Sequence, residues 1–178
     1  MTTSPHVDPD SSIVAIAEKY NAFAIMSDDT DFLFQQYSSK VVIVSGQHLN
    51  PETLDTEVYV PEALANCLGL KINRLPVFAS LKGNDYVHFK KLNCLHQDLN
   101  QSWYRNDNVR SLAKYISMNN VENLEFLDDL AERIFGDSSK AHIIEESIES
   151  YHLSKEFFET PLGVFQVTQS ISPRARTI

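Results

Sequence analysis

The chain has 178 residues, which is enough for one domain or for one domain with an appendage. Apolar residues make up 43% and charged residues 22%, a composition that excludes an intrinsically disordered protein. The formal net charge of −9 argues against general polyanion binding, although residues 61–118 alone are basic, with eight Lys and Arg against four acids.

Several functional classes lack any signal in the sequence. No apolar run reaches 18 residues, and the first residues lack the basic and apolar parts of a signal peptide. Cys67 and Cys94 have no metal-type spacing, the six histidines form no ligand pattern, and no motif for a nucleophilic serine or cysteine occurs. We therefore expect an intracellular protein in a reducing compartment, without a membrane partner.

The first elements predicted are a helix and a strand that lead into an acidic stretch. Apolar residues from Asp10 to Tyr20 follow helical spacing: Ile13, Ile16, Ala17 and Tyr20. Phe23–Met26 is typical of a buried strand, and three carboxylates follow it within four positions: Asp28, Asp29 and Asp31. Because open α/β sheets bind ligands at strand ends, these acids are site candidates, with an ordinary acidic turn as the alternative.

The next segment predicts two more strands and two helices. Val41–Val44 has four β-branched residues in a row, and Glu57–Val60 predicts a third, short strand. Pro61 suits the first turn of a helix that ends at Leu68, and a second apolar helix covers Leu75–Leu81.

The remainder of the chain is predicted to be mainly helical. We expect an irregular linker over residues 88–106, a helical region over 107–159 and a loose tail over 160–178. Three apolar stripes within 109–151 predict helices that pack on a core. Trp103 and Tyr104 either pack against these helices or stack on a base.

Carboxylates recur in pairs along the first half of the chain. Asp8 and Asp10 precede the first helix, Asp29 and Asp31 follow the strand 21 residues later, and Asp85 follows the helix over 75–81. A helix and a strand of this length return the chain close to its starting level, so the pairs can meet on one rim. Clustered carboxylates suit Mg²⁺, and two such ions serve phosphodiester hydrolysis, whereas chance pairing in an acidic chain is the alternative.

Three motifs together resemble the internal region of the flap-endonuclease and XPG-like nuclease superfamily. They are Asp8-Pro-Asp10, then Ala24-Ile-Met-Ser-Asp-Asp-Thr-Asp31-Phe, and then Leu75-Pro-Val-Phe-Ala-Ser-Leu-Lys-Gly-Asn-Asp85-Tyr-Val. The Leu-Pro before Gly-Asn-Asp-Tyr and the Asp-Asp-Thr-Asp-Phe-Leu run are most similar to the asteroid branch, which includes the constitutive coactivators of PPAR-gamma. The similarity covers residues 8–87.

The resemblance implies an α/β fold: a partial PIN-like parallel sheet with flanking helices over residues 1–87, followed by an all-α region. It also implies a site that binds Mg²⁺ or Mn²⁺, with Asp29 and Asp31 as catalytic residues. The metal-facing acids carried over from the family are Asp8, Asp10, Asp29, Asp31 and Asp85. DNA or RNA, branched or single-stranded, and possible protein partners are expected, in the nucleus.

Two features of the family have no counterpart in this sequence. Its amino-terminal half, with an opening strand, two further metal aspartates and an arch, is absent, and so is the glycine-rich helix–hairpin–helix that follows Asp85. Lys82, Lys90 and Lys91 bracket Asp85 instead and are candidates for holding phosphates, with a solvated loop as the alternative. Two functions follow: a metal-dependent, structure-specific nuclease, or a non-catalytic asteroid-type protein that binds nucleic acid or acts as a transcriptional coactivator.

Overall fold

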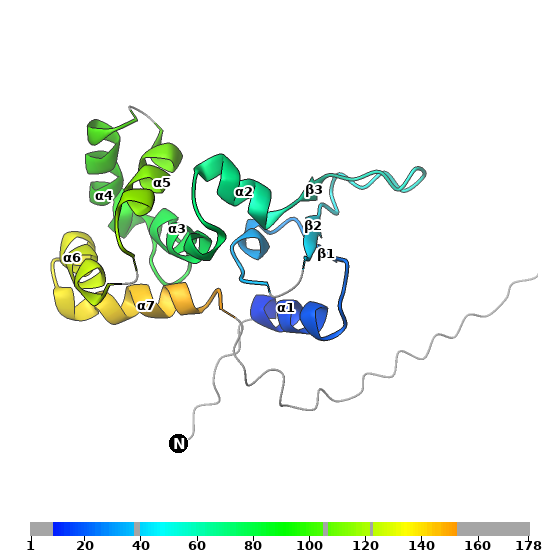
Figure 1. Cartoon of the computed structure of the whole chain (residues 1–178), viewed down its shortest axis with the longest axis horizontal. Helices are drawn as coiled ribbons and strands as arrows, with labels where there is room; N and C mark the ends of the chain where they lie inside the picture. Colours follow the sequence, from blue (N-terminus) through cyan, green and yellow to red (C-terminus); the bar gives the residue numbers. More distant parts are fainter. Residues whose placement is uncertain (1–8, 38–39, 105–106, 122, 153–178) are drawn as a thin grey trace, which may run out of the picture.

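The computed structural model describes residues 9–37, 40–104, 107–121 and 123–152, which form a small α/β unit followed by a helical region (Figure 1). The α/β unit contains α1 (Pro9–Lys19), β1 (Ala24–Met26), the 3₁₀ turn η1 (Thr30–Leu33), β2 (Val42–Val44) and β3 (Val58–Tyr59). The helices that follow are α2 (Pro61–Leu68), α3 (Leu75–Lys82), α4 (Phe89–Ser102), α5 (Asn108–Met118), α6 (Leu124–Phe135) and α7 (Ala141–Glu149). Short 3₁₀ turns, η2 (Ile72–Arg74) and η3 (Ser138–Lys140), precede α3 and α7.

The sheet is mixed, with the strand order β1-β2-β3. β1 and β2 are parallel, as the resemblance implies, but β3 runs antiparallel to β2, so the expectation of a parallel sheet is wrong for the third strand. The reason is the β2–β3 connection, which folds back on itself without a crossover helix. Backbone hydrogen bonds from Ser45 N to Glu57 O and from Asn50 N to Asp55 O hold it as an arm that projects from the sheet (Figure 1).

One face of the sheet packs on α1. Ile25 and Ile43, which are register partners, form a small core with residues of α1, η1 and the start of β2: Val14, Ala17, Phe32 and Val41. The predicted helix is confirmed, but of its predicted apolar stripe only Ala17 faces this core. Ile13, Ile16 and Tyr20 are 43%, 42% and 70% exposed, because the helix turns Val14 and Ala17 inward.

The segment expected to be irregular contains a helix, so the prediction of an irregular linker over residues 88–106 is wrong. α4 covers 14 of these residues. Its buried positions Leu92, Leu95 and Leu99 have helical spacing that the surrounding polar residues conceal in the sequence. His88 supplies the cap, since its side chain accepts a hydrogen bond from Lys90 N.

The larger core lies among the helices. Seven of the eight residues of α3 are buried, and most apolar positions predicted for α5, α6 and α7 belong to the same cluster of buried residues. The limits of the predicted domains stay a prediction, and the tail over 160–178 lies outside the described residues. None of the helices within the described ranges is both long enough and apolar enough to cross a bilayer.

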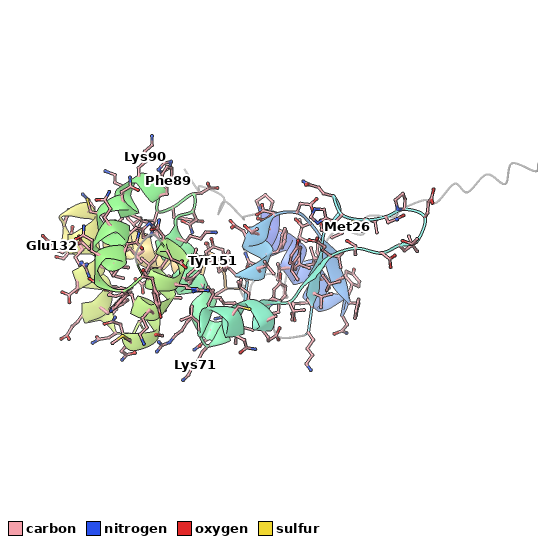
Figure 2. The ribbon with its side chains drawn as sticks, turned by 90° about the horizontal axis from the view of Figure 1, so that it is seen from above. Met26, Lys71, Phe89, Lys90, Glu132 and Tyr151 are labelled. Atoms are coloured by element: carbon pink, nitrogen blue, oxygen red, sulfur yellow. The ribbon has the colours of Figure 1, made fainter. Side chains whose placement is uncertain are left out.

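Phe34 joins the two parts of the fold. It follows η1, yet its ring packs in the helical core, with centroids 6.1 Å from Phe78 and 6.3 Å from Tyr151. The neighbouring backbone adds a hydrogen bond from Gln36 N to Tyr151 O of 3.0 Å, and Ser11 Oγ donates to Ser150 O at 3.2 Å. The end of α7 is therefore fixed against η1 and α1, and Tyr151 lies between the two parts in Figure 2.

Candidate metal and nucleic-acid site

Three of the predicted acids line one pocket where the α/β unit meets the helical region. Asp10 comes from the first turn of α1, Asp31 from η1, and Asp85 from the turn between α3 and α4. The cavity measures about 360 Å³ and is called the acidic pocket below. Its other lining residues are Pro9, Gln35, Asn84, Tyr86, Ser150 and Tyr151.

Asn84 determines where Asp85 lies. Its side-chain oxygen accepts hydrogen bonds from Tyr86 N at 3.1 Å and Val87 N at 2.9 Å, which closes the turn after α3. Its amide nitrogen donates to Ser147 Oγ at 2.8 Å and Tyr151 Oη at 3.2 Å on the α7 side. The Asn84 side chain thus closes the acidic turn and connects it to α7 and to Tyr151 just after it.

The acids of the pocket act on one another electrostatically. Burial raises the pKa of Asp31 above its ordinary value, and the negative charges of Asp29, Asp10 and Asp85 raise it further. The ammonium group of Lys82 acts in the opposite direction and lowers this pKa. Neighbouring carboxylates repel one another and so disfavour ionisation, and a bound cation would reduce this repulsion.

Asp29 and Asp28 face a second cavity of about 260 Å³ on the side of the arm. Asp29 Oδ1 accepts a hydrogen bond from Asp31 N at 3.0 Å and so caps η1. Asp28 accepts from Ser45 Oγ at 2.6 Å and from Gln47 N, and these hydrogen bonds lower its pKa. Both side chains therefore have structural partners, although the charge of Asp29 still reaches Asp31.

The structure divides the predicted site residues into three groups. Asp10, Asp31 and Asp85 share the acidic pocket, Asp29 lies beside it, and Asp8 lies outside the described residues. Lys82 is close enough to act on Asp31, and its ammonium group lies 6.0 Å from the centre of the Phe34 ring.

The other two predicted lysines belong to the start of α4. Lys90 and Lys91 are both exposed in its first turn. Trp103, for which packing and base stacking were both open, packs against α5 with its ring 6.0 Å from that of Tyr115.

The acidic pocket is lined by oxygen donors. Gln35 is 3% exposed, lines the pocket, and its side-chain oxygen has no hydrogen-bond partner among the described residues. Carboxylate and amide oxygens are the ligand types that Mg²⁺ prefers. Within the described residues, however, no three His, Cys, Asp or Glu side chains are arranged to hold a metal ion together, so an ion here would have to be bound partly through water.

Few signals in the sequence indicated which other residues complete this pocket. Gln35 is the first of two adjacent glutamines and carries no motif, and Ser150 and Tyr151 lie 65 residues or more beyond Asp85. Asn84 stands inside the Gly-Asn-Asp-Tyr motif, but only the structure shows that its side chain bonds to α7.

Comparison with known proteins gives one match. Residues 68–155, just under half of the chain, match the family model described as the FAM120A-like domain. The match contains Asp85, Asn84 and α3 to α7, whereas Asp10 and Asp31 precede it. Neither a comparison with curated proteins nor one with solved structures returned a match.

Proposed function

We propose that this chain is an asteroid-type, PIN-like protein whose acidic pocket binds a divalent cation and, through it, the phosphates of DNA or RNA. One observation carries the proposal: Asp10, Asp31 and Asp85, from three separate elements, line one cavity together with Gln35, whose buried side-chain oxygen has no hydrogen-bond partner among the described residues. The FAM120A-like match supports it, because that family is related to the asteroid branch of the XPG-like nucleases. A nuclear location belongs to the same proposal.

The residues in and around the pocket would have different roles. Asp10, Asp31 and Asp85 would hold Mg²⁺ or Mn²⁺, directly or through water, with Gln35 as a neutral oxygen ligand. A bound divalent cation neutralises phosphate charge and lowers the pKa of its water. Lys82, beside Asp31, would contact the same phosphates, and Lys90 and Lys91 would contact the next ones along the backbone.

The second candidate function is hydrolysis of the phosphodiester. It is favoured by the proximity of Asp29 to Asp31, since a second ion would need acids next to the acidic pocket. Against it, the side chain of Asp29 caps η1 and that of Asp28 is bonded to Ser45. We therefore place cation-assisted binding first and metal-dependent, structure-specific cleavage second.

Cation binding can be tested by thermal unfolding with added Mg²⁺ or Mn²⁺. A ligand at 100 times its Kd stabilises the folded state by about 2.7 kcal/mol, so the melting temperature should rise with metal concentration. Asp85→Asn should abolish this rise. The matched control is Asp55→Asn, an exposed acid of the arm, which should leave it unchanged. Equal responses of both variants would contradict a site at the acidic pocket.

Cleavage is tested separately with flap, bubble and single-stranded substrates, in Mg²⁺ or Mn²⁺ and with chelator. Metal-dependent cuts that are lost in Asp29→Asn and Asp31→Asn would support the nuclease. Metal-dependent binding without any cut would support the binding protein alone.

A further inference from the structure

Two large aromatic side chains are exposed close to Asp85 in the sequence. Tyr86, which lines the pocket, is 48% exposed, and Phe89, the first residue of α4, is 54% exposed. His88 stands between them in the sequence, and its ring lies 4.9 Å from that of Phe89 at an interplanar angle of 33°. Aromatic rings that face solvent next to a charged pocket offer their faces to a planar ligand.

The backbone that carries these rings is fixed. Asn84 accepts hydrogen bonds from the amides of Tyr86 and Val87, and the Val87 side chain is fully buried. Phe89 packs directly on Gly83, where a Cβ atom would lie 2.9 Å from Phe89 Cβ. A preorganised surface loses little conformational freedom when it binds, so the rings are ready for a ligand.

Three lysines lie close to these aromatic residues in the sequence. Lys82, Lys90 and Lys91 are exposed within ten residues of sequence, in which Asp85 is the only acid. Phe89 and Lys90 lie next to each other at the edge of the helical region in Figure 2. Lys82 acts on Asp31, so this basic strip begins at the acidic pocket. Positive charge interleaved with exposed aromatic rings is the pattern of single-stranded nucleic acid binding.

We infer that Tyr86 and Phe89 form a stacking platform for the unpaired bases of a single-stranded nucleic acid whose phosphates contact Lys82, Lys90 and Lys91. This rests on the proposed function, because it concerns the strand that the acidic pocket would hold. Phe89 lies four positions after Asp85, a span of at most about 14 Å, so pocket and platform serve neighbouring nucleotides. A duplex keeps its base faces stacked inside the helix and cannot use such a platform.

The platform is tested by fluorescence anisotropy with three labelled probes: an oligothymidylate, an abasic strand of equal length, and a duplex. The oligothymidylate should bind more tightly than the other two. Phe89→Ala and Tyr86→Ala should each weaken it roughly 5- to 100-fold, the loss expected for one stacked base, and leave the abasic strand unaffected. Phe89→Trp should preserve binding.

Phe23→Ala is the matched control, because Phe23 is 80% exposed at the start of β1 and should have no effect. Equal losses in Phe89→Ala and Phe23→Ala, or equal binding of the abasic strand and the oligothymidylate, would overturn the platform. Binding that depends on Phe89 but not on Mg²⁺ would leave the platform standing and contradict the proposed function. Binding that depends on Mg²⁺ but not on Phe89 would support the proposed function and contradict the platform.

Discussion

At the scale of single residues, Asp31 stands in an environment that disfavours its charge. It lies in the acidic pocket with Asp10 and Asp85, and its pKa is raised by burial and by the neighbouring carboxylates. A raised folded-state pKa means that folding becomes less favourable as the pH rises from the ordinary pKa of 3.8 through the folded value. At neutral pH the full free-energy cost of ionising Asp31 in the folded state is present. Such unfavourable charges are common at functional sites.

Asp31→Asn should therefore stabilise the protein at neutral pH in the presence of chelator, because it removes the disfavoured charge. We expect a gain on the order of 1 kcal/mol, or a melting temperature higher by about 2–4 °C. The gain should shrink as the pH falls towards 3.8, where Asp31 of the wild type takes up its proton. Differential scanning calorimetry over this pH range measures both effects.

Mg²⁺ provides the control for this prediction. The cation should stabilise the wild type and not Asp31→Asn. The wild type should therefore melt at the lower temperature without metal and at the higher temperature with it. A variant that melts below the wild type at neutral pH without metal would show that the Asp31 carboxylate stabilises the fold.

At the scale of elements, the α3–α4 turn depends on Gly83. Its φ of 113° is one that other residues rarely adopt, and the first residue of α4 packs against its Cα. This close contact sets the direction of α4 and brings Phe89 back towards Asp85. The turn therefore couples the path of the helix to the position of the acid.

Gly83→Ala should destabilise the protein by about 3 kcal/mol or more, because a strained φ adds to a steric conflict with Phe89. Urea denaturation measures the loss. Gly136→Ala is the control: its φ is also positive, at 66°, but a Cβ there meets nothing within 4 Å, and a cost of about 1 kcal/mol is expected. Equal costs at the two positions would show that the contact with Phe89 is not limiting.

The elements also show what a sequence can predict. Strong local signals determined β2, α2, α3 and the three helices of the carboxyl-terminal region, and the motifs placed Asp10, Asp31 and Asp85 on one rim. Two errors had different causes. Leu92, Leu95 and Leu99 do have helical spacing, but the polar residues of α4 hide it. The antiparallel course of β3 depends on how the arm between β2 and β3 folds back. Gln35 and Tyr151 reach the pocket only through tertiary packing.

At the scale of the whole molecule, the acidic pocket exists because two packed parts meet. Phe34 places η1 against the helical core, and Ser150 and Tyr151 return the end of α7 to α1. The helical side has a contiguous core of buried residues. The α/β side is smaller, and it exposes large apolar side chains near β1: Ile13, Ile16, Tyr20, Phe23 and Met26.

The exposed edge of β1 lies next to this apolar surface. Phe23 O accepts a hydrogen bond from Val42 N, and Ser27 N donates to Val44 O, so alternate residues face β2. The backbone groups of Ala24 and Met26 therefore face the other side, where the sheet of the described residues has no further strand. An exposed strand edge beside apolar side chains favours association.

The double variant Phe23→Lys with Met26→Lys should reduce both self-association at high protein concentration and binding of the hydrophobic dye ANS. Because these side chains are 80% and 61% exposed, the free energy of unfolding should change by less than about 0.5 kcal/mol per site. Sedimentation velocity and dye fluorescence measure the two effects. Leu54→Lys is the control, since Leu54 is 74% exposed on the arm, away from the β1 edge. If it lowers association as much as the double variant does, the β1 surface has no special role.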